Sequence, residues 1–205
     1  AIQATLMDTM GTVYTSLGLY DSAVSLVRKA YEKRLQLRGS GHEETAASLS
    51  HLGEVLSLRA DYDEAGKRLS EALSIRKTLF GAESKPVADT LLIYADNLRA
   101  QGDYAKSEQV IREALAIQRK LYGDKPNAEV ARSLETLGLN HYDRGQVEEA
   151  ITTLREVAAM QKQLHEGKAH PAYAQSIDNL AFVLSETGRT GEAEPLMRLA
   201  LAMKR

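Results

Sequence analysis

Hydrophobic residues recur at three- and four-residue steps along the whole chain, in paired segments. In the first segment Met10, Tyr14 and Leu17 follow this spacing, and Gly18 then interrupts it. This spacing places the side chains on one face of an α-helix. Glycine ends a helix readily, because it adopts the left-handed backbone without a steric penalty. A second segment of the same kind covers residues 20–38, so the pattern predicts a helical hairpin.

The hairpin pattern then recurs with a nearly fixed period. Tyr20, Tyr62 and Tyr104 are 42 residues apart, and the last two repeats follow at a step of 43. Such a period is typical of stacked helical repeats, in which neighbouring hairpins bury each other's apolar faces. We therefore expect an all-α fold, a right-handed superhelical solenoid of five helical hairpins, forming a single domain over residues 1–205. The predicted repeats cover residues 3–41, 43–83, 85–125, 127–168 and 170–205.

Small residues occupy one equivalent position in each first helix and one in each second helix. They are Gly11, Gly53, Ala95, Gly138 and Ala181, and then Ala23, Ala65, Ser107, Ala150 and Ala193. Small side chains at both positions let the two backbones approach closely, while larger residues fill the flanks. Pro86, Pro126 and Pro171 lie between repeats, where proline ends one helix and can open the next.

The overall composition argues against several classes of protein. The 26 Lys and Arg residues against 28 Asp and Glu residues give a net charge of −2, so the chain lacks the basic excess typical of nucleic-acid binding. Without cysteine it forms neither disulfides nor thiolate metal sites. No apolar run is long enough for membrane insertion and no signal-peptide pattern is present, so we expect a cytoplasmic protein. The start inside a predicted helix, without Met, suggests a fragment of a longer protein.

Potential catalytic residues form no recognisable motif. None of the five histidines makes a metal-binding pair at helical spacing with a supporting acid, and His141 takes a core-type position. His165 and His170 bracket Gly167 in a predicted loop between repeats. The segment 39–41 is too short for a phosphate-binding loop and lacks its lysine. We therefore expect no enzymatic activity, no cofactor and no metal.

The repeated pattern resembles the tetratricopeptide repeat. That family places Leu-Gly and an aromatic residue in the first helix, and Ala with a large apolar residue in the second. Leu52-Gly53 and then Ala65 and Leu69 fit this pattern, and all five units resemble it. The usual period is 34 rather than 42 or 43. The first-helix Trp is also replaced, by Met7, Leu49, Leu91, Leu134 and Ile177.

The longer repeat is similar to the kinesin light chain variety of the family. The resemblance rests on residues 170–174 (HPAYA), 177–181 (IDNLA) and 191–196 (GEAEPL). The opening run, residues 3–14 and 17–20, also resembles the repeat region of bacterial serine/threonine protein kinases. In those proteins the repeats follow the catalytic domain, and no kinase motif is present in this sequence.

The family resemblance implies a concave groove, lined by the first helices, that holds an extended peptide or a partner helix. Counted from the small residue of each first helix, the groove positions lie three before it, one after it and four after it. Each repeat then offers one carboxylate, and the C-terminal half adds apolar side chains. The predicted groove residues are Asp8, Thr12, Glu54, Leu92, Asp96, Arg99, Glu135, Leu139, Tyr142, Asp178, Asn179 and Phe182.

These residues differ from the Lys, Asn and Arg clamp with which chaperone-binding members hold acidic tails. Acidic and apolar residues stand in its place, so we expect a partner protein or peptide with Lys or Arg and one or two apolar anchors. The alternative for the acids is a solvated helix face that binds nothing. Phe182 is the stronger indication, because the chain has only two Phe residues.

The second helices carry many basic residues, with Glu32, Glu71 and Glu113 among them. The basic residues are Arg28, Lys29, Lys33, Arg34, Lys67, Arg68, Arg76, Lys77, Arg112, Arg119 and Lys120. Because the acids interleave with them, a solvated convex face with ion pairs explains this set better than a nucleic-acid site does.

The sequence therefore predicts a non-catalytic protein–protein interaction module, as the regulatory or scaffolding part of a larger signalling protein. The alternative is self-association. The last predicted helix carries Leu196, Leu199, Ala200 and Met203 with no polar capping helix after it, although solenoid ends need a polar outer face. That alternative predicts a homodimer packed end to end through the terminal helix.

Overall fold

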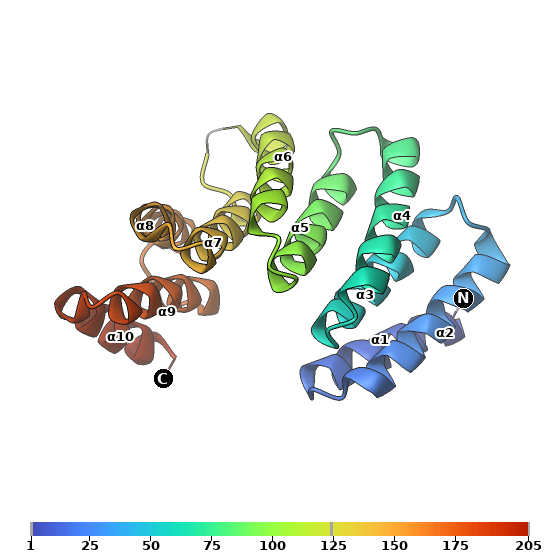
Figure 1. Ribbon diagram of the computed structural model, residues 1–205, viewed down its shortest axis with the longest axis horizontal. Helices are drawn as coiled ribbons and strands as arrows, with labels where there is room; N and C mark the ends of the chain where they lie inside the picture. The colour runs from blue at the N-terminus through green and yellow to red at the C-terminus, as the bar shows by residue number, and fades with distance from the viewer. Residues whose placement is uncertain (1, 124, 205) are drawn as a thin grey trace. The chain divides into compact units, whose positions relative to one another are not determined.

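The fold consists of helices joined by short turns. The computed structural model describes residues 2–123 and 125–204, and the regular secondary structure of these residues is entirely α-helical, which confirms the predicted all-α solenoid of helical hairpins (Figure 1). The helices are α1 (Ile2–Ser16), α2 (Tyr20–Arg38), α3 (Glu43–Leu58), α4 (Tyr62–Phe80), α5 (Lys85–Ala100), α6 (Tyr104–Tyr122), α7 (Ala128–Asp143), α8 (Val147–Leu164), α9 (Pro171–Glu186) and α10 (Thr190–Met203). None of these helices combines the length and hydropathy needed to cross a bilayer.

The chain divides into two compact units. Unit 1 is Ala1–Ile117 and unit 2 is Gln118–Arg205. Unit 1 holds α1 to α5 and most of α6. Unit 2 holds the end of α6 and the hairpins α7–α8 and α9–α10.

Side-chain caps explain where several helices begin. His42, Asn127 and His170 are the N-cap residues of α3, α7 and α9, and each side chain accepts a backbone N–H of the first turn. Four hairpin turns place glycine in the left-handed conformation, but the turn between α3 and α4 uses Ala60, at φ 70°. That conformation costs a residue with a Cβ about 1–2 kcal/mol.

The small residues allow the predicted close packing of helices. A Cβ built on Gly53 would lie 2.6 Å from Cγ of Leu69, and one on Gly138 would lie 2.8 Å from Cγ of Leu154. Both distances are too short for a real contact, so a larger residue would push the second helix away. The close approach is therefore required at the equivalent place in each unit.

Each unit has its own hydrophobic core. In unit 1 a cluster joins α2, α3 and the start of α4, and it consists of Ala23, Val24, Val27, Leu52, Val55, Leu56 and Ala65. In unit 2 the corresponding cluster joins α8, α9 and the start of α10, and it consists of Ala150, Ile151, Leu154, Leu180, Val183, Leu184 and Ala193. Both clusters lie where one hairpin stacks on the next, as expected for a solenoid.

The last helix differs from its prediction. Ala200 is fully buried, and Leu196 and Met203 pack against the cluster around Tyr173 and Ile177. These side chains therefore contribute to the core, and the expectation that they form an outer apolar face is wrong for all three. The exposed large apolar residues of α10 are Met197, Leu199 and Leu201.

Candidate functional site

In unit 1 the predicted groove residues of α3 and α5 line a common cavity. The cavity has a volume of about 300 Å³. Its lining residues are Glu54, Ser57, Leu58, Ile93, Asp96, Arg99 and Ala100. Three of the predicted groove residues, Glu54, Asp96 and Arg99, are thus brought together by two first helices.

The carboxylates of this cavity are accessible. Glu54 and Asp96 are exposed, and Asp96 lies 3.9 Å from Nε of Arg99 in a loose ion pair. Leu58 and Ile93 lie beside them and can pack on the aliphatic stem of a long side chain. The cavity can therefore hold a Lys or Arg side chain, with its charged group near the two carboxylates and its aliphatic part against Leu58 and Ile93.

Asp8 has a structural role that the sequence did not indicate. Its carboxylate lies 2.8 Å from Nη1 of Arg34 and 2.6 Å from Nδ1 of His51. Burial alone would raise the pKa of Asp8, but hydrogen bonds and charge from His51 and Arg34 hold it below the ordinary value of 3.8. The neighbouring Thr12 is exposed, and its hydroxyl donates to the carbonyl of Asp8.

Leu92 lies in the core rather than in the groove. Only 3% of its surface is exposed, so it cannot serve as the apolar anchor that the sequence suggested. The equivalent Ser50 is also buried, whereas the polar Asp8 is half-buried. This position faces the neighbouring first helix, as the contact between Asp8 and His51 shows.

In unit 2 the groove positions of α7 and α9 form an aromatic surface. The rings of Tyr142 and Phe182 meet edge to face, with centroids 5.6 Å apart and planes at 74°. Phe182 is 48% exposed, and Leu139 and Tyr142 are half-buried. This arrangement offers apolar area with two rigid rings, which is the composition of many binding hot spots.

The remaining predicted residues of unit 2 bond within the fold. Nδ2 of Asn179 donates to the carboxylate of Glu135, in the same relation as His51 to Asp8 in unit 1. Asp178 pairs with Lys204. Both acids therefore already have bonding partners within the fold.

Two histidines near the aromatic hairpin form a contact that spacing could not predict. The rings of His165 and His170 stack with centroids 3.4 Å apart and planes at 10°. Burial, and then the nearby charge of His170, lower the pKa of His165 below 6.5. His141, by contrast, is buried in α7, at the core-type position that the sequence predicted for it.

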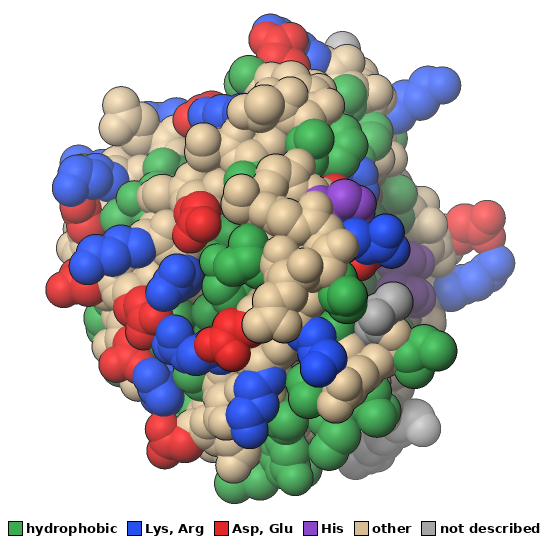
Figure 2. Space-filling view, turned by 90° about the vertical axis from the view of Figure 1, so that its right-hand side faces the viewer, with side chains coloured by type: hydrophobic (Ala, Val, Ile, Leu, Met, Phe, Trp, Pro, Cys, Tyr) green, Lys and Arg blue, Asp and Glu red, His purple; other side chains and the backbone are tan. Residues whose placement is uncertain are grey.

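The basic residues of the second helices mostly form ion pairs. Arg28 and Arg68 both contact Glu64, and Lys77 contacts Glu113. On the face that Figure 2 shows, Lys and Arg side chains lie among Asp and Glu side chains rather than in a separate basic stripe. This supports the interpretation of a solvated face.

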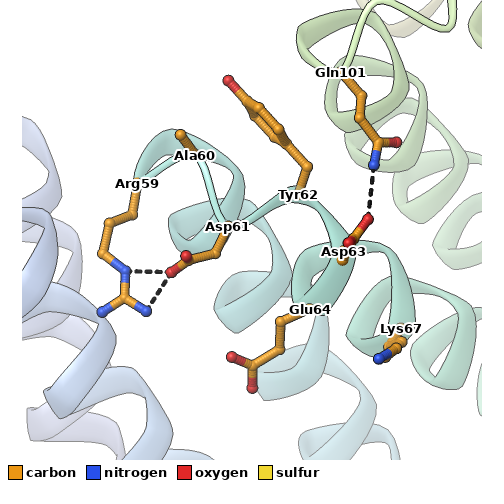
Figure 3. Close-up of a pocket in the computed structure, with 8 residues that line it drawn as sticks. All are labelled: Arg59, Ala60, Asp61, Tyr62, Asp63, Glu64, Lys67 and Gln101. Carbon is orange, nitrogen blue, oxygen red and sulfur yellow. Dashed lines mark hydrogen bonds and ion pairs between the residues drawn. The ribbon is translucent and has the colours of Figure 1, made fainter.

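A polar cavity of about 600 Å³ surrounds the turn between α3 and α4 (Figure 3). Arg59 bonds to Asp61 on one side of it, and Gln101 donates to Asp63 on the other. Ala60, Tyr62, Glu64 and Lys67 complete its lining. None of these residues was predicted as a site residue.

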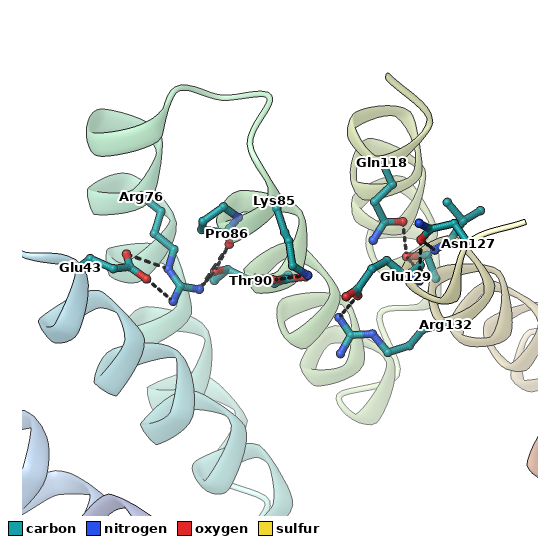
Figure 4. Close-up of polar contacts among 12 residues, drawn as sticks. Glu43, Arg76, Lys85, Pro86, Thr90, Gln118, Asn127, Glu129 and Arg132 are labelled. Carbon is teal, nitrogen blue, oxygen red and sulfur yellow. Dashed lines mark hydrogen bonds and ion pairs between the residues drawn. The ribbon is translucent and has the colours of Figure 1, made fainter. Parts of the chain in front are cut away.

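Arg34 and Arg76 do not belong to the solvated face. Nη1 of Arg76 donates to Oγ1 of Thr90 at 2.7 Å, and its Nη2 lies 2.9 Å from Glu43 (Figure 4). Arg34 makes the equivalent bond to Ser48. Gln118 takes this place in unit 2, where it accepts from Ser133 at 2.6 Å. These side chains therefore join a second helix to the next first helix.

A family model described as tetratricopeptide repeat matches residues 2–84, 86–163 and 129–205. The chain belongs to the tetratricopeptide repeat family. None of the curated proteins matches the sequence.

Several solved structures share the fold of this chain at low sequence identity. Kinesin-light-chain-type repeats from Podosopora anserina give a TM-score of 0.76 at 21% identity, covering 100% of this chain and 96% of that one. BtubC (BKLC) from P. vanneervenii gives 0.76 at 24% identity, covering 97% and 78%. The Rap conjugation regulator of plasmid pLS20, in complex with the Phr* peptide, gives 0.81 at 20%, covering 98% and 53%. The resemblance to kinesin light chain repeats is thus confirmed for the fold.

Within this tetratricopeptide chain the groove prediction identified two exposed clusters. One is the cavity with Glu54, Asp96 and Arg99, and the other is the surface with Tyr142 and Phe182. It could not identify the internal partners of Asp8, Glu135 and Asp178, because those partners come from other helices. It missed the histidine stack for the same reason.

Proposed function

We propose that this chain is a non-catalytic protein-interaction module that binds a peptide or helix of a partner protein through exposed residues of its first helices. Tetratricopeptide repeats are generally interaction modules. A Rap regulator with the same fold is known in complex with a peptide, and this supports a peptide as the ligand class.

The observation that carries the proposal is the aromatic pair of unit 2, in which Phe182 is exposed. Phe182 and Tyr142 contact each other while nearly half of Phe182 remains accessible. An exposed aromatic side chain adds little to stability, but it can contribute 2 kcal/mol or more to binding when a partner covers it. We propose that this surface holds an apolar anchor of the partner.

Unit 1 supplies the second element of recognition. Glu54 and Asp96 attract a Lys or Arg side chain, and Leu58 and Ile93 pack on its stem. Charge of this kind contributes mainly to the association rate and to partner choice. Asp8, Glu135 and Asp178 already have partners within the fold, so we do not assign them to ligand contact.

The test is affinity capture from a lysate of the source organism, with the wild-type chain, Phe182→Ala and Phe80→Ala as baits. Phe80 is the matched control, because it is the other Phe and is 46% exposed on α4. A partner retained by the wild type and by Phe80→Ala but lost by Phe182→Ala supports the proposal. Equal capture by all three baits contradicts it.

Peptides of the captured partner then test whether the unit 1 cavity with Glu54 and Asp96 contributes to binding. Fluorescence polarisation should show binding weakened about tenfold or more by Phe182→Ala, corresponding to about 1.4 kcal/mol. Glu54→Gln with Asp96→Asn should slow association and reduce its salt dependence. Glu156→Gln, which removes an exposed carboxylate of α8, is the control. Recovery of the peptide at unchanged mass would agree with a non-catalytic role.

Self-association is the second candidate function. Leu6 on α1 is 58% exposed, and Met197 and Leu201 are exposed on α10. Sedimentation should show a dimer that Leu201→Glu dissociates and that Leu121→Glu, an exposed control, leaves intact. A monomer at all accessible concentrations would eliminate this candidate.

The predicted cytoplasmic location and signalling role belong to the same proposal. Fractionation of cells that express the tagged parent protein would check the location. Identification of the captured partner would check the role.

A further inference from the structure

One face of α1 carries a continuous stripe of exposed apolar side chains. Steps of three and four residues place them on the same side of the helix, and even the least exposed of them, Met10, has 41% of its surface accessible. Figure 2 shows hydrophobic side chains gathered on the lower part of this side of the molecule, where the α1–α2 hairpin lies in Figure 1. The α1 stripe consists of Ile2, Leu6, Met10, Val13 and Leu17, of which Leu17 directly follows the helix. An exposed apolar patch of this kind marks an interaction surface.

In the next hairpin of unit 1 the equivalent face of the first helix is covered. Leu52 of α3 corresponds to Met10, and Val55 corresponds to Val13, at the repeat step of 42 residues. Both are fully buried, in the cluster that side chains of the preceding helix α2 complete. The face that bears the α1 stripe is therefore one that packs against another helix.

The flanking positions of the two faces differ in polarity. At α3 they are polar, and each of the three side chains bonds to a charged residue of α2; they are Glu44, Ser48 and Arg59. In the α1 stripe the same three positions are apolar, and they are Ile2, Leu6 and Leu17. A helix with the charged surface of α2 would lose hydration against these residues without gaining a hydrogen bond. The α1 stripe therefore fits a partner helix that is apolar along its whole length.

The exposed surface of α1 is also uncharged. The structure describes α1 throughout, and the one charged residue of this helix is Asp8, which is half-buried and bonds to Arg34 and His51. Each of the other helices exposes at least one charged side chain. A two-fold symmetric contact places a surface against its own copy, so charged residues near the axis would face like charges. A contact between two copies of α1 avoids this repulsion.

The α1 stripe is symmetric about its own centre. Ile2 and Leu17 are equally distant from the midpoint between positions 9 and 10, and so are Leu6 and Val13. When two copies of a helix pack antiparallel about a two-fold axis, residues equally distant from the axis face each other. Leu6 then faces Val13 of the second copy, Ile2 faces its Leu17, and Met10 lies near the axis. Every apolar side chain of the stripe thus meets another apolar side chain.

We infer that α1 binds α1 of a second copy of this chain, in an antiparallel contact with two-fold symmetry. Both halves of the contact come from α1, so it is an alternative to the end-to-end contact through α10 described above. The contact contains neither Phe182 nor Tyr142, so dimerisation and the proposed peptide binding can fail separately.

The experiment is sedimentation equilibrium of the full chain over a range of concentrations. The wild type should show a monomer–dimer equilibrium. Leu6→Glu should raise the dimer dissociation constant about tenfold or more, because it buries a carboxylate against Val13 of the second copy at two symmetric places. Leu121→Glu on α6 and Leu201→Glu on α10 also replace exposed residues, and they should leave the dissociation constant unchanged. Circular dichroism checks that each variant is folded.

Mixing two variants tests the antiparallel pairing itself. Leu6→Glu and Val13→Lys should each weaken the dimer, whereas an equimolar mixture of the two should associate more tightly than either alone. In the mixed dimer the new carboxylate faces the new ammonium group at one place, and the apolar pair remains at the other. Ile2→Lys is the matched control, because position 2 faces position 17 rather than position 6. A mixture of Leu6→Glu with Ile2→Lys should therefore associate less than the first mixture does.

Several results would overturn the inference. They are a monomer at every concentration, a dimer that Leu6→Glu leaves intact, and equal association of the two mixtures. A dimer that Leu201→Glu dissociates would also overturn it, because α10 would then supply part of the contact. None of these results bears on the capture experiment with Phe182→Ala, which tests the proposed peptide binding.

Discussion

The two units present different chemistry at the same helix positions. One and four residues after the small residue of the first helix, unit 1 places Glu54 and Ser57 on α3, and Asp96 and Arg99 on α5. Unit 2 places Leu139 and Tyr142 on α7, and Phe182 and Ser185 on α9. The first set forms a cavity with carboxylates, and the second forms an aromatic surface. Exposed groove positions can thus change chemistry freely.

The positions of close approach between two helices do not vary in this way. Leu69 packs against Gly53 in unit 1 just as Leu154 packs against Gly138 in unit 2. A change at such a position disturbs the distance between two helices, whereas a change in the groove disturbs only solvent or a ligand. The comparison predicts equal core energetics in the two units and different responses elsewhere.

The largest expected effect tests the equality of the cores. Leu69→Ala and Leu154→Ala should each reduce the free energy of unfolding by about 2–5 kcal/mol, because both side chains are fully buried. Urea denaturation followed by circular dichroism measures this. A cost below about 1 kcal/mol in only one unit would mean that the cores are not equivalent.

Glycine substitutions should show where two helices need a glycine in order to pack closely and where they do not. Gly138→Ala should destabilise unit 2 by about 1–3 kcal/mol, since its Cβ would overlap Leu154. Gly66→Ala should instead stabilise unit 1 by about 0.5–1 kcal/mol, because the site has room and alanine favours the helix. Denaturation midpoints compare the two, and a destabilised Gly66→Ala would show that this glycine is also needed for packing.

Acid should act on unit 1 through Asp8. Its folded pKa is lowered, so the ionised carboxylate stabilises the fold above about pH 5 and loses this effect as pH falls below 3.8 toward the folded value. The wild type should lose about 1 kcal/mol more than Asp8→Asn between pH 6 and pH 3. Urea titrations at both pH values test this. Asp21→Asn, at an exposed position, should behave like the wild type.

The smallest effect concerns the two histidine caps. A neutral imidazole accepts the N–H of Glu44 or Ala172, but an imidazolium cannot, and its charge opposes the helix dipole. Only His170 of unit 2 also stacks on another histidine. The folded pKa of His165 is lowered, so its contribution is present above pH 6.5 and is lost as pH falls through the folded value.

Hydrogen exchange should therefore respond to mild acid more strongly in unit 2. After correction for the intrinsic pH effect, first-turn amides of α9 should exchange roughly two to three times faster at pH 5.5 than at pH 7.5, and those of α3 less so. His170→Asn should remove the response, because Asn127 caps α7 in the same position. Equal responses of α3 and α9 would assign no role to the stack.

The repeated sequence pattern was sufficient to predict the hairpins, the turn at Gly18, the second helix over residues 20–38, and the contacts of the small residues. It was insufficient for the groove. Leu92 was assigned to the groove because it lies three residues before the small residue Ala95, a groove position that the family resemblance implies, yet that position faces the next first helix. Arg34 and Arg76 were assigned to a solvated face, although they bond to the following hairpin.

The sequence by itself determined the period, the helical hairpins and the positions of close approach, because these depend on local helix geometry and on apolar spacing. The tertiary structure decided which polar side chains remain available to a ligand. Asp8 and Glu54 look alike in the sequence, but only Asp8 meets Arg34 and His51. The same holds for Asn97 of α5, whose side-chain amide donates to the carbonyl oxygen of Tyr62 in α4. Bonds between different helices depend on distances in space, and a residue pattern along one helix does not contain them.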